Sequence, residues 1–111
     1  AGLCCGEPNI LGWDILRNHA TAFVSCPDWV TARGMRTLGA PEKGDPRVIS
    51  GESGAVTTGL VETLMLDPEY ADLKELIGLD KTSSVLCFST EGDTDPDQYR
   101  RIVWEGEYPT C

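Results

Sequence analysis

The sequence has little histidine and no paired cysteine spacing. Its 111 residues include one histidine, His19, and five cysteines, of which Cys4 and Cys5 are adjacent. No two cysteines are separated by two residues, the spacing typical of structural zinc sites. An odd number of cysteines also does not suit a closed disulfide framework. We therefore expect reduced thiols, no metal site and a cytoplasmic protein.

Positive charge and long apolar runs are also scarce. Nine lysine and arginine residues stand against 18 aspartate and glutamate residues, which gives a formal net charge of −9. Nucleic acids and anionic membranes attract basic surfaces, so this acid excess argues against both as partners. No apolar run approaches the roughly 18–20 residues that span a bilayer. The composition, 41% hydrophobic and 24% charged, is typical of a globular domain.

The spacing of apolar residues predicts a helix-rich chain. Apolar stripes at helical intervals, with capping residues at their ends, indicate five helices. We expect these to begin near Asn9, after a Ser25–Asp28 capping pair, near Ala55, near Tyr70, and at Asp95 followed by Pro96. The second helix is expected to end at residue 39, the third near residues 67–68 and the fourth at residue 78.

Two short apolar runs, residues 48–49 and 85–88, predict buried strands. Each run leads into a turn rich in serine, glycine and glutamate, and then into a helix. Strands joined by helical crossovers are normally parallel, so this pattern predicts an α/β architecture. Ligands of such sheets bind beyond the carboxyl ends of the strands. The residues expected to line a crevice there are Ser50, Gly51, Glu52, Ser89, Thr90, Glu91 and Asp93.

The first of these turns, SGESG at residues 50–54, has two interpretations. A glycine-rich turn at the N-terminus of a helix exposes N–H groups that can hold an anion. The alternative is a tight turn into a helix, with Glu52 placed favourably for the helix dipole. A serine hydrolase is disfavoured, because Ala55 breaks the G-x-S-x-G pattern and only one histidine is available.

The second turn is crowded with carboxylates, namely Glu91, Asp93, Asp95 and Asp97. Four carboxylates so close together would repel a phosphate, which favours a neutral or cationic ligand atom. An EF-hand is excluded, because the glycine and glutamate at its fixed positions are missing. The three lysines lie in loops or on exposed helix faces by pattern, and none is placed as a buried nucleophile.

Several stretches taken together resemble one family. LCCGEPN, SCPDWV, GMRTLG, DPRVISGESGAV, VLCFSTEGDTDP and VWEGEYP are similar to the carboxy-terminal part of diaminopropionate ammonia-lyase, in order and over nearly all of the chain. The resemblance implies a homodimeric, pyridoxal-phosphate-dependent lyase that converts 2,3-diaminopropionate to pyruvate and ammonia by β-elimination. The opening AGLCCGEP, which lacks a methionine, also leads us to expect a chain that begins inside a domain.

The resemblance also implies a fold. Residues 1–111 would form a single segment of the catalytic domain, which has the tryptophan synthase β and threonine dehydratase fold. That fold has three layers around a parallel sheet, to which this helix-rich chain would contribute about two or three short strands.

The family resemblance assigns site residues as well. The Schiff-base lysine, the acid/base aspartate and the phosphate loop lie upstream in this family, so no catalytic residue is expected here and the chain alone is expected to be inactive. Thr90, with Ser89 as the alternative, matches the hydroxyl residue that bonds the pyridine nitrogen. Ser50, Gly51 and Glu52 would line the cofactor from the other side. Related dehydratases often have Gly-Gly after that hydroxyl residue, where this chain has Glu91 and Gly92.

Two alternatives stay open. One is a serine or threonine dehydratase of the same fold. The other is an acidic binding module without catalytic activity.

Overall fold

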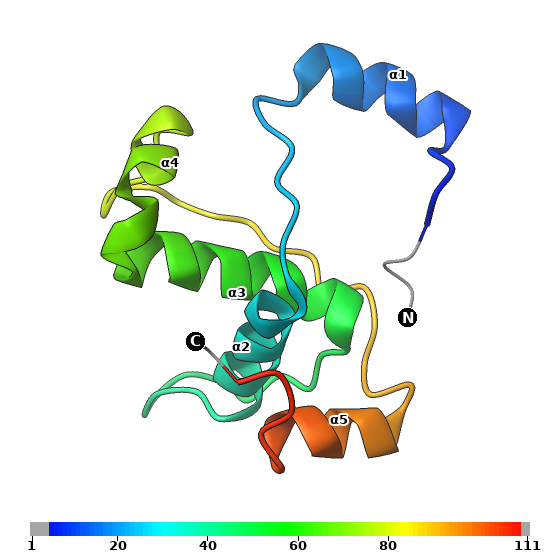
Figure 1. Cartoon of the computed structure of the whole chain (residues 1–111), viewed down its shortest axis with the longest axis vertical. Coiled ribbons are helices and arrows are strands. Elements are labelled where there is room, and N and C mark those ends of the chain that lie inside the picture. Colours follow the sequence, from blue (N-terminus) through cyan, green and yellow to red (C-terminus); the bar gives the residue numbers. More distant parts are fainter. Residues whose placement is uncertain (1–4, 110–111) are drawn as a thin grey trace.

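The computed structural model describes residues 5–109, and the regular elements in that range are helices (Figure 1). They are α1 (Ile10–His19), α2 (Asp28–Gly39), α3 (Glu52–Leu66), the 3₁₀ turn η1 (Pro68–Tyr70), α4 (Ala71–Leu76) and α5 (Pro96–Val103). All five helices expected from the sequence are present, and α3 begins three residues earlier than its apolar stripe indicated. Within the described residues, no helix is long and apolar enough to cross a membrane.

The prediction of an α/β fold with two or three parallel strands is wrong. Residues 5–109 contain no strand, and the two apolar runs at 48–49 and 85–88 have no regular structure. A strand needs a ladder of backbone hydrogen bonds to a neighbour. The nearest such bond joins the turns that follow these two segments, from the Gly51 N–H to the Glu91 carbonyl at 3.0 Å. The expected burial is also absent, because Leu86 is 78% exposed and Phe88 is 69% exposed.

Local capping signals explain where two of the helices begin. The Asn9 side chain accepts a hydrogen bond from Gly12 N at the start of α1, and Asp95 accepts one from Gln98 N at the start of α5. Pro96 then occupies the first turn of α5, where its missing N–H costs nothing. The expected cap on α2 is wrong, since Pro27 is its N-cap and no side chain caps this end.

The core lies where α2, α3 and α5 meet. Its buried side chains are Ala32, Met35, Ala55, Tyr99 and Ile102, with Leu38 and Val103 packed against them. The α2–α3 crossing is close enough that glycine is required on both helices. A Cβ atom on Gly34 would lie 2.1 Å from the carbonyl oxygen of Ala55, and one on Gly59 would lie 1.9 Å from that of Val30. The two backbones are therefore in direct contact.

An ion pair also joins α2 to the C-terminal end of α3. Arg33 Nη1 lies 2.6 Å from Asp67 Oδ2 and donates to Thr63 Oγ1 at 2.9 Å. The Arg33 guanidinium also stands over the ring of Trp29, 5.6 Å from its centroid. Because Arg33 belongs to α2 and Asp67 directly follows α3, this cluster links the two helices.

Helix α1 stands apart from this core (Figure 1). It makes no contact with any other helix of the described chain. Its apolar residues are therefore uncovered, with Ile10 82% and Leu11 81% exposed. A ring contact near it joins Trp13 to Phe23 in the connection that follows, at a centroid distance of 5.9 Å.

Candidate functional site

The two polar turns predicted from the sequence lie against each other. The Gly51 N–H donates to the Glu91 carbonyl at 3.0 Å, and Ser89 Oγ donates to Ser50 Oγ at 3.0 Å. These two segments, about 40 positions apart in the sequence, are thus in contact, and we call them the turn pair (residues 50–54 and 89–94). The structure thus brings the two turns together, although no sheet edge does so.

Two glycines make this close approach possible. A Cβ atom on Gly51 would lie 2.6 Å from both Glu91 Cγ and the Gly92 carbonyl oxygen. A Cβ atom on Gly54 would lie 3.0 Å from Ser89 Cα. Gly51 has an ordinary φ of −73°, so space and not backbone strain is the reason for glycine at this position.

The carboxylate of Glu91 occupies the N-terminus of α3. Its Oε1 accepts hydrogen bonds from Ser53 N at 3.0 Å and from Ser53 Oγ at 2.6 Å, while Oε2 accepts one from Thr94 Oγ1 at 3.2 Å. These donors stabilise the ionised form, so the pKa of Glu91 lies below its usual value, with the Ser53 hydroxyl as the largest cause. The anion at this helix end is the chain's own carboxylate, which supports the tight-turn interpretation of residues 50–54.

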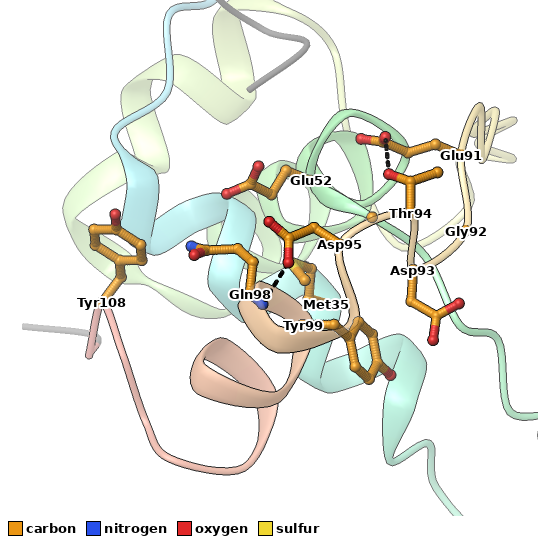
Figure 2. A pocket seen from close by; sticks show the side chains of 11 residues that line it. Met35, Glu52, Glu91, Gly92, Asp93, Thr94, Asp95, Gln98, Tyr99 and Tyr108 are labelled. Carbon is orange, nitrogen blue, oxygen red and sulfur yellow. Dashed lines mark hydrogen bonds between the residues drawn. The ribbon is translucent and has the colours of Figure 1, made fainter.

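A cavity of about 400 Å³ adjoins the turn pair. Its lining includes four carboxylates, those of Glu52, Glu91, Asp93 and Asp95. In Figure 2 the carboxylates of Glu52 and Asp95 lie near the middle of the view, and the Tyr99 ring points away from them. This concentration of negative charge opposes a phosphate group, as the sequence predicted for the second turn.

The predicted cofactor residues differ in how far a ligand can reach them. Thr90 and Ser89 are exposed, and Glu52 is half-buried in the cavity wall. Ser50 is fully buried, and Gly51 is also buried. The Ser50 hydroxyl accepts a hydrogen bond from Ser89 Oγ at 3.0 Å, inside the turn pair. It therefore links the two turns and is out of a ligand's reach.

Sequence reasoning missed the part that Ser53 plays in the turn pair. Its hydroxyl bonds Glu91 at 2.6 Å and lies 3.2 Å from Thr90 Oγ1. Gln98 and Tyr108, which line the cavity, were missed as well. The sequence around Ser53 does not indicate this role, because its partner Glu91 lies 38 residues further along the chain.

Other chemistry-bearing residues lie outside this site. None of the three lysines lines the cavity: one is in the loop between α2 and α3, one is in α4, and one follows α4, at positions Lys43, Lys74 and Lys81. Among residues 5–109, no group of three or more histidine, cysteine, aspartate or glutamate side chains could hold a metal ion. Cys26 and Cys87 form no disulfide, whereas Cys4 and Cys111 lie outside the described residues.

Comparisons with known proteins confirm the resemblance found in the sequence, although no family model matches. The chain is 56% identical over 108 residues to diaminopropionate ammonia-lyase of Escherichia coli strain K12, covering 97% of this chain and 27% of that protein. It is 50% identical over 107 residues to the diaminopropionate ammonia-lyase of Salmonella typhimurium, covering 96% and 26%. The chain therefore spans about a quarter of the length of these curated relatives.

Solved structures of the Escherichia coli protein match as well. Its complex with D-serine superposes with a TM-score of 0.93 at 55% identity, covering 100% of this chain and 28% of that chain. Its complex with an aminoacrylate–pyridoxal phosphate azomethine reaction intermediate also gives 0.93 at 55% identity, covering 100% and 29%. The match extends over all of this chain, including α1.

Proposed function

Because this chain belongs to the diaminopropionate ammonia-lyase family, we propose that it forms part of a pyridoxal-phosphate-dependent carbon–nitrogen lyase. That enzyme converts 2,3-diaminopropionate to pyruvate and ammonia by β-elimination. The observation that carries this proposal is 56% identity over 97% of the chain, since so high an identity over so long a stretch accompanies a shared fold. The chain itself supplies one segment, residues 1–111, of the carboxy-terminal part of the catalytic domain.

The uncovered apolar surface supports the idea of a segment within a longer polypeptide. The side chains of α1 and of residues 85–88 are largely exposed, although stable monomers rarely expose contiguous apolar surface. In the superposed Escherichia coli structure, the matched region is 28% of that chain. A helix without packing partners would not be expected to keep the same position in this chain and in the Escherichia coli structure. In our proposal the rest of the polypeptide therefore covers α1.

The residues present fit one end of pyridoxal phosphate. An exposed hydroxyl, that of Thr90, stands at the outer side of the turn pair, with Ser89 beside it. The phosphate does not fit here, because Glu91 fills the N-terminus of α3 and the adjoining cavity carries four carboxylates. The proposed contact is therefore with the pyridine ring, and the phosphate loop and the cofactor-binding lysine belong to other parts of the enzyme.

The cofactor, when bound, acts as an electron sink for the substrate's α-carbon. The residues of this chain orient it. In the proposal the Thr90 hydroxyl bonds the pyridine nitrogen, while Ser50 and Gly51 hold the turn that carries Thr90. Glu52 forms the cavity wall on the other side. The proposal assigns no proton-transfer step to a residue of this chain, and the chain alone is still expected to be inactive.

The family resemblance adds a homodimer to the proposal, and the reduced thiols expected from the cysteine spacing add a cytoplasmic location.

The experiment that tests the proposal compares two substrates on the full-length enzyme. Pyruvate release is measured with 2,3-diaminopropionate and with serine, each as both stereoisomers. The proposal predicts a higher kcat/KM for diaminopropionate. A higher value for serine would identify the dehydratase alternative instead, and no pyruvate from either substrate would favour the non-catalytic binding module.

A further inference from the structure

The segment that follows α5, residues 104–109, is bonded to α2 through Arg36, and we call it the C-terminal strap. The Arg36 guanidinium donates from Nη1 to the Tyr108 carbonyl at 3.3 Å and from Nη2 to the Glu107 carbonyl. Its Nε donates to the carbonyl of Ile102, in the last turn of α5, at 3.0 Å. One side chain of α2 thus holds both the end of α5 and the strap.

The strap is also anchored to α5 at Glu107. The Glu107 N–H donates to the Arg101 carbonyl at 3.0 Å, and the Glu107 carboxylate accepts from Arg101 Nε at 3.0 Å. The residue before it, Gly106, has a φ of +78°. Because the peptide groups on either side of Tyr108 Cα are both tied down, through Glu107 and through the Tyr108 carbonyl, the direction of the Tyr108 side chain is set by the strap.

Tyr108 adopts a backbone conformation that favours glycine. Its φ is +54°, and among residues 5–109 it is the one residue other than glycine with a positive φ. The left-handed region costs free energy for any residue with a Cβ atom, so such a residue persists only where its surroundings hold it. Strain of this kind is concentrated at functional sites. A tyrosine at this position therefore indicates a use for the side chain itself.

The Tyr108 side chain forms part of the wall of the cavity that adjoins the turn pair. Figure 2 shows Tyr108 on the opposite side of the view from Glu91, with Gln98 and Glu52 between them. Tyr108 is 37% exposed, so most of its surface is covered. The pKa of its hydroxyl lies above the usual value, chiefly because the Glu107 carboxylate is close. The ring therefore bounds the cavity without adding a charge to it.

We propose that Tyr108 is a substrate-binding residue, whose ring contacts 2,3-diaminopropionate in this cavity, and that Arg36 is the positioning residue that holds the ring there. This inference rests on the proposed function, in which Glu52, another residue of the same wall, lies beside the cofactor. A cavity of about 400 Å³ has room for a small amino acid. The ring exchanges no proton with the substrate; it limits the space and excludes water from it.

The test measures kcat and KM for 2,3-diaminopropionate, together with thermal unfolding, on the full-length holoenzyme. Tyr108→Ala and Tyr108→Gly both remove the ring, but only glycine also relieves the left-handed backbone. Both should raise KM by roughly fivefold and leave kcat within about twofold. Tyr108→Gly should nevertheless melt about 1 °C or more above Tyr108→Ala. Tyr108→Phe keeps the ring, so its KM should stay within about twofold of the unsubstituted value.

The role of Arg36 is tested through the same constants. Arg36→Met should raise KM although the ring is present, because the strap is no longer held to α2. The double variant of Arg36→Met with Tyr108→Ala should have the KM of Tyr108→Ala alone, because Arg36 acts only through Tyr108. Trp104→Ala is the matched control. Trp104 is an aromatic residue of the same strap, is 76% exposed and does not line this cavity, so KM should not change.

The outcomes distinguish the two proposals. If the unsubstituted enzyme releases no pyruvate from 2,3-diaminopropionate, the proposed function fails and this inference fails with it. If it does release pyruvate, and Tyr108→Ala and Tyr108→Gly keep the unsubstituted KM, the inference alone is overturned. A KM that differs between these two variants in step with their melting temperatures would also overturn it, since the ring would then act through stability.

Two further results would contradict the inference. A rise in KM for Tyr108→Phe as large as that for Tyr108→Ala would assign the contact to the hydroxyl and not to the ring. Additive effects in the double variant would show that Arg36 acts independently of Tyr108. If Arg36→Met does not fold, Arg36→Lys replaces it, because lysine keeps the positive charge and loses the planar fork that reaches two carbonyls.

Discussion

Replacing Gly59 with alanine should destabilise the helical core severely, although alanine is the better helix former. The favourable effect of alanine on helix propensity is about 1 kcal/mol. A steric clash outweighs this gain, because the added Cβ atom would lie 1.9 Å from the carbonyl oxygen of Val30 and 2.9 Å from the amide nitrogen of Gly34. An ordinary contact begins at 3.4 Å, so α2 and α3 would have to separate by about 1.5 Å.

Such a separation disturbs the packing of Met35 and Ala55, which are almost completely buried where α2 and α3 meet. Overpacking a core costs about 1–3 kcal/mol when side chains can adjust, and here a backbone atom blocks the adjustment. We therefore expect Gly59→Ala to lose about 3 kcal/mol or more, and its melting temperature to fall by roughly 10 °C or more.

The assay is thermal unfolding followed by circular dichroism, with Gly12→Ala as the matched control. Gly12 also lies in a helix, but the nearest atom to its added Cβ is Asn9 Oδ1 at an ordinary 3.7 Å. Gly12→Ala should melt at the same temperature as the unsubstituted chain or slightly above it. A Gly59→Ala variant that melts within about 2 °C of the unsubstituted chain would refute the close crossing of α2 and α3.

Three further predictions concern Arg33, Glu91 and the lysines. Arg33→Met should lower the free energy of unfolding by about 1 kcal/mol, because it removes the partly exposed bonds to Asp67 and Thr63; denaturant titration measures this, and no change would contradict it. The depressed pKa of Glu91 stabilises the fold above its unfolded pKa of about 4.3, and this contribution is lost as the pH falls through the lower folded value. Unfolding midpoints between pH 7 and pH 3 should therefore converge for the unsubstituted chain and Glu91→Gln, and a constant gap would contradict the assignment. Finally, pyridoxal phosphate followed by borohydride should not label any one lysine of the isolated chain stoichiometrically, and mass spectrometry would detect the contrary result at Lys43, Lys74 or Lys81.

The helices could be predicted because their signals are local. Asn9 and Asp95 cap helices within three residues of themselves, and Gly78, at φ +73°, follows the short α4 helix as expected. The strands could not be predicted reliably, because an apolar run such as residues 85–88 becomes a strand only when another strand pairs with it. Apolar content alone does not supply that neighbour.

The candidate site was predictable in part because the composition of its two turns is a local signal. Two turns of similar composition indicated a shared site, and the structure joins them through Gly51 and Glu91. The sequence could not show that Glu91 would fill the N-terminus of α3, since Ser53 and Glu91 meet only through the tertiary fold. The burial of Ser50, which removes its hydroxyl from a ligand's reach, depends on that same contact between distant segments.

The most direct test of the central claim is the ratio of ammonia to pyruvate released from 2,3-diaminopropionate by the full-length enzyme. β-Elimination followed by hydrolysis consumes one water and releases both amino groups, so two ammonia molecules should form for each pyruvate. The activity should disappear when pyridoxal phosphate is removed and return when it is added back. Release of no pyruvate, or of pyruvate at a rate that does not depend on the cofactor, would contradict the account.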